Sequence, residues 1–181
     1  MGIDEAGRGP LAGPVVAAGV ILPRGDPPIE GVDDSKKLSP KKRETLYTQI
    51  VAAALGYFIA EVDNQTIDQI NIYQATKRAV YACVEGIAPR PDFIYVDGDM
   101  KFDFGIPYRS VVAGDSLVYH CACASILAKV HRDRLMSTLP ERYALYRFDR
   151  HKGYATELHY ELLHRYGLSD LHRKTFCLDR G

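Results

Sequence analysis

Four acidic side chains stand at or just beyond the ends of predicted strands and helices. They are Asp4, Glu5, Asp97 and Asp115. Carboxylates are natural ligands of Mg²⁺ and Mn²⁺, and a pair of such ions needs several carboxylates that converge. Two ions about 4 Å apart can activate a water, hold a phosphate and offset the charge on a leaving oxygen. The four acids are therefore candidate ligands of two divalent metal ions. The residues alone leave their convergence open, because conspicuous acids are usually surface residues.

Neighbouring acids restrict which side chains can share one site. Asp4 and Glu5 are adjacent, and adjacent residues on a regular strand point to opposite faces of the sheet. Both can reach one site only if the strand bends or ends there, which the conformational freedom of Gly7 allows. Asp115 and Asp133 flank the same predicted helix at a separation of 18 residues, or roughly 27 Å, so they cannot both reach one metal pair. We interpret Asp133, which has an arginine on either side, as a residue of a solvated helix face.

The predicted elements place these acids in an α/β layer fold. A short strand ends at residues 2–4, a turn rich in glycine and proline covers residues 7–14, and a β-branched, apolar strand follows at residues 15–22. Further strands are predicted at residues 57–62, 93–96 and 108–112, and helices at residues 39–55, 71–86, 116–138, 141–146 and 156–166. Strands followed by alternating strands and helices indicate a mixed sheet, and the apolar strands indicate helices on both faces. No repeat or linker divides the chain, so one domain over residues 1–181 is expected.

Composition and charge narrow the class of protein. The chain has 181 residues, 46% of them hydrophobic, with no apolar run long enough for a membrane span and no signal peptide, which predicts a protein of the cytoplasm. Its formal net charge is zero, but residues 129–181 carry a net +4 and residues 1–128 a net −4. An acidic part that could bind metal and a basic part that could bind phosphate fit a nuclease. An accidental asymmetry of the surface would look the same.

The cysteines raise the question of a second metal site. His120 and the cysteines at 121 and 123 lie within four residues, but zinc-binding cysteines usually have two to four residues between them and a second pair elsewhere. We therefore expect Cys121 and Cys123 to pack inside a helix of small residues. The four cysteines also lack the spacing of a disulfide framework.

Beyond the acids, the sequence resembles the ribonuclease HII family in six blocks that appear in family order. The blocks are GIDEAGRGPLAGPVV (2–16), DSKKLS (34–39), YVDG (95–98), GDS (114–116), ASILAKV followed by Arg132-Asp133 (124–133), and HKGY (151–154). The resemblance implies a ribonuclease H-like fold, with a five-stranded mixed sheet flanked by helices and a helical C-terminal part from about residue 140. It also implies that the catalytic set, which binds two Mn²⁺ or Mg²⁺ ions, consists of Asp4, Glu5, Asp97 and Asp115.

The resemblance further implies a substrate and a reaction. The family hydrolyses the RNA strand of RNA–DNA hybrids and cuts duplex DNA on the 5′ side of an embedded ribonucleotide, leaving a 3′-hydroxyl and a 5′-phosphate. The tripeptide matching Gly7-Arg8-Gly9 reads the ribose, and the tyrosine matching Tyr154 packs on the sugar. Glycine lets backbone groups approach a ligand, and the 2′-hydroxyl distinguishes RNA from DNA. From the residues alone, an ordinary tight turn and a packing tyrosine are the simpler interpretations.

Basic residues are candidates for phosphate contacts. Five of them lie within eight positions: Lys36, Lys37, Lys41, Lys42 and Arg43. Part of this group falls on the first turn of a predicted helix, where positive charge opposes the helix dipole and a bound anion would explain it. Lys36 lies in a family block and is assigned to substrate binding, whereas a solvated surface explains the outer lysines equally well. His151 could act as a proton shuttle by residue type, but an activated water needs no histidine base.

Two other functions compete with this interpretation. Another nuclease of the same fold, such as a junction resolvase, would also have clustered acidic residues, but it would not need a turn that reads the ribose. A non-catalytic nucleic-acid-binding module would gain nothing from acids that face phosphates, and a chelator would leave its binding unchanged. We expect a monomer that acts on an RNA–DNA hybrid or on a duplex with an embedded ribonucleotide, with no evident clamp-binding segment. Only three residues precede Asp4, fewer than is usual in the family, so either the first strand is short or the start of the sequence is trimmed.

Overall fold

β1 (Gly2–Ala6) is the central strand of the sheet, with two strands on each side of it. β2 (Val15–Ile21) lies antiparallel on one side of it, and β4 (Ile94–Asp97) lies parallel on the other. β3 (Gly56–Val62) and β5 (Tyr108–Val111) complete the sheet in the order β3-β2-β1-β4-β5. The prediction of a five-stranded mixed sheet is confirmed.

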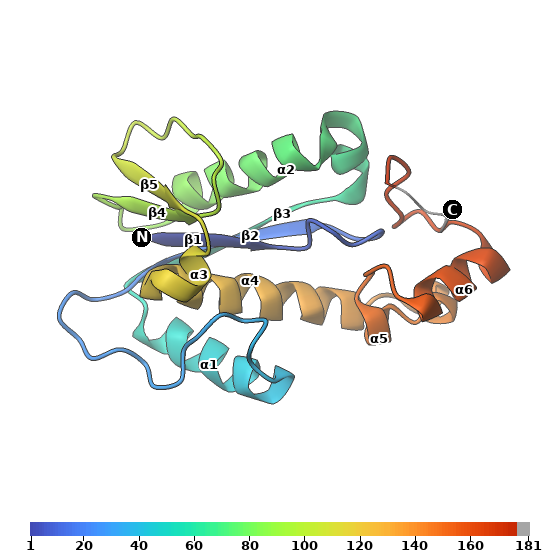
Figure 1. The fold of residues 1–181 in the computed structure, drawn as a ribbon, viewed down its shortest axis with the longest axis horizontal. Helices are drawn as coiled ribbons and strands as arrows, with labels where there is room; N and C mark the ends of the chain where they lie inside the picture. Colours follow the sequence, from blue (N-terminus) through green and yellow to red (C-terminus); the bar gives the residue numbers. More distant parts are fainter. Residues whose placement is uncertain (177–181) are drawn as a thin grey trace.

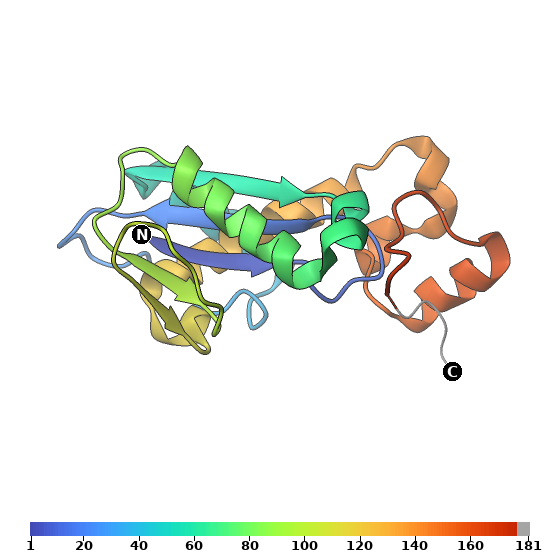
Figure 2. The ribbon, with the colours of Figure 1, turned by 90° about the horizontal axis from the view of Figure 1, so that it is seen from above.

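Helices cover both faces of this sheet in the computed structural model, which describes residues 1–176. α2 (Asn64–Gly86) packs on one face, and α4 (Tyr119–Ser137) packs on the other with α1 (Pro40–Ala53) beside it (Figure 1). Seen from above, α2 lies across the strands (Figure 2). Within the described residues, no helix is both long enough and apolar enough to cross a membrane.

β2 shows why both faces can be covered. Val15 and Ala17 belong to the core cluster under α2, whereas Val16 and Ala18 belong to the cluster under α4. All four side chains are fully buried. A continuous apolar run of this kind is typical of a strand covered on both faces, as the sequence predicted.

The predicted start of α1 is confirmed, whereas the predicted start of α2 is wrong. Ser39 caps α1 by accepting a hydrogen bond from Lys42 N, and Pro40 takes the first helical position. α2 begins at Asn64 instead of residue 71, with the Asp63 carboxylate as its cap. The apolar stripe that predicted this helix starts only after its polar first turns, and Asn71 kinks it with a φ of 65°.

The helix predicted at residues 116–138 is interrupted. A short helix, α3 (Gly114–Leu117), ends at Val118, whose extended backbone (φ −123°, ψ 110°) separates it from α4. Asp115 therefore lies within a short helix of its own and does not merely precede the long one.

The helical C-terminal part expected from about residue 140 is confirmed. It comprises the 3-10 helix η1 (Glu141–Tyr146), α5 (Phe148–His151) and α6 (Glu157–Tyr166), at the end of the sheet where β1 ends (Figure 1). Leu11 N donates to Gly153 O at 2.8 Å, and Arg173 N donates to Leu11 O at 2.8 Å. These backbone bonds join the C-terminal part to the turn that follows β1.

Three buried histidines hold the C-terminal part together. The rings of His151 and His159 stack with centroids 4.1 Å apart, and His159 Nε2 lies 3.0 Å from His172 Nε2. His159 Nδ1 donates to Tyr154 O, and His151 Nδ1 accepts from Gly153 N. A ring nitrogen that accepts a hydrogen bond belongs to a neutral ring, and His151 Nδ1 accepts from Gly153 N while His172 Nδ1 accepts from Ser169 N. Burial lowers the pKa of His151 and of His172 to about 4. His151 is therefore a neutral packing residue, not a candidate proton shuttle.

We expect acid to destabilise the protein through these histidines. His172 stays neutral in the folded state down to a pKa of about 4 but gains a proton in the unfolded chain below about pH 6.5. Its stabilising contribution is complete at pH 7 and is lost as the pH falls from about 6.5 to 4. We compare the free energy of unfolding of the wild type with that of the His172→Gln variant. As the pH falls over this range, the wild-type value minus the variant value should decrease by up to about 1.4 kcal/mol per pH unit. Urea titrations measure this difference, and the contributions of carboxylates cancel in it because both proteins share them. A difference that stays constant with pH would contradict the expectation.

The cysteines of the described chain are packing residues. Cys121 and Cys123 are fully buried in α4, as predicted, and burial raises the pKa of each thiol to about 12. Cys83 is buried between α2 and the sheet. Cys177 lies outside the described residues.

Candidate metal centre and substrate-binding turn

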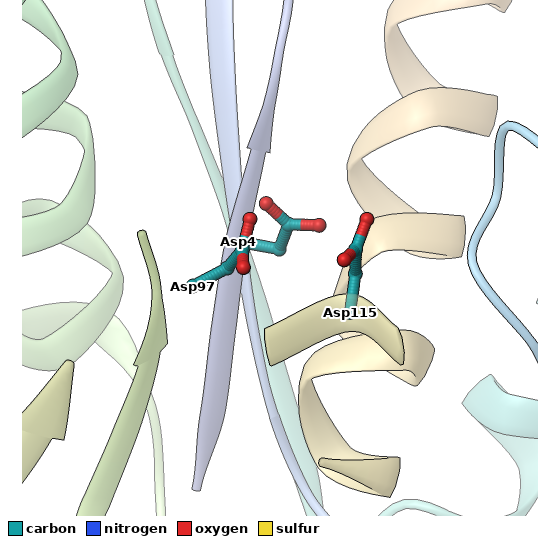
Figure 3. Close-up of side chains that lie close together, drawn as sticks. All are labelled: Asp4, Asp97 and Asp115. Atoms are coloured by element: carbon teal, nitrogen blue, oxygen red, sulfur yellow. The ribbon is translucent and has the colours of Figure 1, made fainter. Parts of the chain in front are cut away.

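Asp4 and Asp97 lie side by side because their strands are parallel neighbours. β1 and β4 pair through Ile3 and Val96, whose side chains belong to the core under α2. The next residue on each strand therefore points to the opposite face. Asp115, on α3, completes a group in which one carboxylate oxygen of each residue lies within 4.8 Å of the others (Figure 3).

The backbone of α3 and of the residues before it is held against Asp97. Gly114 N donates to Asp97 Oδ1 at 2.6 Å, and Gly98 N donates to Val111 O at 2.9 Å. A Cβ at position 114 would lie 3.2 Å from Asp97 Oδ1, so glycine permits this close approach. Ala113 has a left-handed backbone with a φ of 56°, a conformation that alanine rarely adopts and that is common at functional sites.

The three aspartates repel one another in a poorly solvated site. Asp4 is only 5% exposed, and burial, followed by the charges of Glu5 and Asp97, raises its pKa well above the usual range. Burial and the charge of Asp97 also raise the pKa of Asp115. The Lys36 ammonium lies 3.6 Å from Asp115 Oδ2 but offsets only part of this charge, because its side chain is 81% exposed. Divalent cations would remove the repulsion, and carboxylate oxygens are the ligands that Mg²⁺ and Mn²⁺ prefer.

Glu5, the fourth predicted ligand, lies outside this group. β1 continues past Asp4 to Ala6, whereas the sequence predicted that it ends at Asp4. Glu5 pairs with Ala17 and so starts from the other face of the sheet, as strand alternation requires. Its Oε1 lies 3.3 Å from Arg8 Nη1, but its Oε2 is the one buried side-chain oxygen or nitrogen of residues 1–176 that lacks a hydrogen-bond partner. A buried oxygen without a partner is costly, and a bound cation would satisfy it, which keeps Glu5 among the candidate ligands.

The interpretation of Asp133 as a solvated residue is wrong. Its carboxylate lies 2.7 Å from Lys129 Nζ and 3.7 Å from Arg43 Nη2, and its side chain is 21% exposed. Arg43 is itself buried and donates to Ser35 O at 2.9 Å, so it is not available to a phosphate. Asp133 is thus a structural ion-pair partner and does not belong to the aspartate group.

The turn after β1 presents exposed backbone next to an aromatic ring. Gly7 is buried and has a φ of 92°, whereas Arg8 and Gly9 are exposed. No atom lies within 4 Å of a Cβ built on Gly9, so a ligand can approach the backbone there. Tyr154 is 37% exposed, and the guanidinium carbon of Arg132 lies 5.5 Å from the centre of its ring.

Three further residues, which the sequence did not predict, lie next to these sites. The charge of Asp34 contributes to the raised pKa of Asp115, after burial and Asp97. Asp34 opens a family block in which only Lys36 had been assigned a role. Arg132 and Arg173 donate to carbonyl oxygens of the turn, and no local pattern marks an arginine as buried, because arginine is nearly always a surface residue.

One protein family accounts for nearly the whole sequence. The family described as Ribonuclease HII matches residues 1–179. This chain belongs to the ribonuclease HII family. A ribonuclease HII from Caldicellulosiruptor saccharolyticus is 50% identical over 175 residues, which are 97% of this chain and 85% of that protein.

Solved structures agree with this assignment. The ribonuclease HII of Archaeoglobus fulgidus, solved in a complex with PCNA, has a TM-score of 0.79 at 27% identity and covers 96% of this chain and 91% of its own. The ribonuclease H2 of Pyrococcus horikoshii OT3 has a TM-score of 0.76 at 26% identity, with 98% and 93% covered. The ribonuclease H-like fold is confirmed, and the chain, as a member of this family, is an endonuclease that hydrolyses phosphodiester bonds.

Proposed function

We propose that this protein hydrolyses the RNA strand of RNA–DNA hybrids and cuts duplex DNA on the 5′ side of an embedded ribonucleotide. The products are a 3′-hydroxyl and a 5′-phosphate. The observation that carries the proposal is the convergence of three aspartates at β1, the strand that leads directly into the Gly7-Arg8-Gly9 turn, in which Arg8 and Gly9 are exposed. The strand β1 thus supports both the aspartate group, which would bind metal, and the turn, which would contact the ribose.

The carboxylates of Asp4, Asp97 and Asp115, with Glu5, would hold two divalent ions, Mg²⁺ or Mn²⁺. When bound, such ions activate a water and offset the charge on a leaving oxygen. The protein supplies position: neighbouring strands place Asp4 beside Asp97, and the bond from Gly114 N to Asp97 Oδ1 orients that carboxylate. The burial that raises the pKa of Asp4 also excludes competing water.

The substrate would lie across the turn and Tyr154. Backbone groups of Gly7-Arg8-Gly9 would contact the 2′-hydroxyl, and the exposed ring of Tyr154 would pack on the sugar. The exposed Lys36 ammonium beside Asp115 would contact a phosphate next to the site. Phosphate contacts hold the register but carry no sequence information, as required of an enzyme that acts at a ribose in any sequence.

We further propose that the protein acts in the cytoplasm as a monomer. Its relative from Archaeoglobus fulgidus was solved in a complex with PCNA. The lack of an evident clamp-binding segment in the sequence therefore does not argue against a clamp as partner.

The test is cleavage of a DNA duplex that carries one ribonucleotide, in Mg²⁺, in Mn²⁺ and in excess chelator, beside the same duplex made of DNA only. We expect a single cut 5′ to the ribonucleotide, no cut in the all-DNA duplex, and a rate at least about 1,000-fold lower in chelator, because the carboxylates alone cannot offset the developing charge. Mapping the product ends checks for the 3′-hydroxyl and the 5′-phosphate.

Two outcomes would replace the proposal. Cleavage of a branched DNA junction, with the ribonucleotide duplex left intact in either metal, would indicate a resolvase. Binding of the duplex without cleavage in any metal, and with an affinity that a chelator does not change, would indicate a non-catalytic module.

A further inference from the structure

Two arginines are completely buried beneath the Gly7-Arg8-Gly9 turn. They are Arg132, on α4, and Arg173, in the segment that follows α6. Neither forms an ion pair with any carboxylate of residues 1–176. Taking a cation out of water without an ionic partner is costly, so the hydrogen bonds made by the two guanidinium groups must have a specific role.

Arg173 binds the turn itself through its carbonyl oxygens. Its Nη2 donates to Gly7 O at 2.6 Å, and its Nη1 donates to Arg8 O at 2.9 Å. Its Nε and Nη2 also donate to Gly13 O, at 3.0 Å and 2.8 Å. One guanidinium thus holds both peptide groups that flank Arg8 and ties them to the far end of the same loop. With these carbonyls turned inward, the exposed edge of the turn has a fixed orientation.

Arg132 connects the same loop to Tyr154. Its Nε donates to Pro14 O at 2.9 Å, its Nη2 to Ala12 O at 3.0 Å and its Nη1 to Lys152 O at 3.0 Å. Its guanidinium carbon also lies 5.5 Å from the centre of the Tyr154 ring. The turn and the aromatic ring, which lie more than 140 residues apart in the sequence, are therefore fixed relative to one another.

The segment that carries Arg173 is anchored on α2. The Asp68 carboxylate accepts from Lys174 N at 2.9 Å and from Thr175 N at 3.0 Å. Asn64 Nδ2 donates to His172 O at 3.2 Å. Arg173 therefore reaches the turn from a fixed backbone.

We infer that Arg173 is a positioning residue for ribose recognition: it orients the Gly7-Arg8-Gly9 backbone for the 2′-hydroxyl, with Arg132 fixing that backbone relative to Tyr154. This inference rests on the proposed function, in which the turn contacts the ribose. Arg173 does not touch the substrate, because its guanidinium is fully buried behind the turn. Its removal should therefore impair recognition of the ribose and leave general contacts with duplex DNA intact.

The experiment compares Arg173→Lys with the wild type on two duplexes. Cleavage of a duplex with one ribonucleotide gives kcat/KM, and an all-DNA duplex used as a competitor gives Ki. We expect kcat/KM to fall about 10- to 100-fold, because a displaced contact of about 1 Å can have an effect of this size. Ki should stay within about twofold, because phosphate contacts are unchanged.

Arg43→Lys is the matched control. Arg43 is also a buried arginine that donates to backbone carbonyls, those of Ser35 and Leu38, but it holds a different loop. Its replacement should lower the thermal midpoint in a similar way while changing kcat/KM and Ki by the same factor. If Arg173→Lys also changes both constants by one factor, or changes neither, Arg173 is merely structural and the inference is wrong.

A second variant covers the case in which Arg173→Lys does not fold. Asp68→Ala removes the anchor of the 173–175 segment at a half-exposed position. It should lower kcat/KM several-fold with Ki unchanged, and an unchanged kcat/KM would overturn the inference. If the wild type itself fails to cut the ribonucleotide duplex, the proposed function fails instead, so the two failures are distinguishable.

Discussion

Replacing Asp4 by asparagine is expected to abolish cleavage and, at the same time, to stabilise the metal-free protein. Cleavage should fall at least about 1,000-fold, because the amide cannot supply the negative charge that the proposed divalent ions would need at the aspartate group. Stability should rise because burial and neighbouring charges raise the pKa of Asp4 in the folded protein. An acid whose pKa is higher in the folded than in the unfolded chain destabilises the fold at every pH above its unfolded pKa, where folding requires either a bound proton or a buried charge. Asparagine carries neither, so its amide removes this cost.

Asp133→Asn is the control for Asp4→Asn. Asp133 is ion-paired with Lys129 and Arg43 outside the aspartate group. Its replacement should leave cleavage within about threefold and lower the free energy of unfolding by about 1 kcal/mol. Cleavage rates in Mg²⁺ and urea titrations in chelator measure both effects. Two results would show that Asp4 is not a ligand in a repulsive cluster. One is an Asp4→Asn variant that still cuts at a rate comparable to that of the wild type, and the other is a variant that is less stable than the wild type without metal.

Replacing Gly7 by alanine should have the largest effect on the turn. A Cβ at this position would lie 2.1 Å from Arg132 Nε and 2.8 Å from Pro14 O. The arginine cannot move aside without losing hydrogen bonds that keep its buried charge satisfied, and a φ of 92° is itself strained for alanine. We expect the free energy of unfolding to fall by about 2–4 kcal/mol, and kcat/KM on the ribonucleotide duplex to fall at least about 100-fold.

Gly25→Ala separates the backbone effect from the packing effect. Gly25 has a nearly identical φ of 89°, but no atom lies within 4 Å of a Cβ built there. Its replacement should therefore reveal the conformational cost alone, about 1 kcal/mol, with unchanged cleavage. Thermal or urea unfolding of both variants tests this difference. If Gly7→Ala and Gly25→Ala lower the free energy of unfolding equally, Arg132 can move aside at little cost and does not hold the loop.

Local signals predicted much of the fold. The apolar run of β2 and the Ser39 cap of α1 act within a few residues, so both elements could be placed from the sequence. The first turns of α2 are polar and were missed, although Asp63 is a good cap. The break at Val118 has no glycine or proline to mark it, so the sequence predicted one helix where there are two.

The candidate site depended on information that local patterns do not contain. Asp4 and Asp97 meet because β1 and β4 are neighbours in the sheet, and strand order cannot be derived from either segment alone. The family resemblance supplied that grouping, and the structure brings three of the four acids together while leaving Glu5 outside. The bonds from Arg173 to the turn cross about 160 residues of sequence, so no pattern of spacing could have revealed them.

The position of β1 at the centre of the sheet also determines how the aspartate group comes apart. β1 pairs with β2 along its whole length and with β4 at Gly2 and Ile3, and it is covered on both faces, so its paired amide protons should exchange with solvent only when the sheet opens. α3, which carries Asp115, is a helix of four residues between the strained Ala113 and the extended Val118, and such an element opens locally at a small fraction of that free energy. We therefore expect the Asp4 and Asp97 half of the group to persist for as long as the fold does, and the Asp115 half to detach and return whenever α3 opens. Ions held by the group as proposed would therefore exchange through the α3 side without any unfolding of the enzyme.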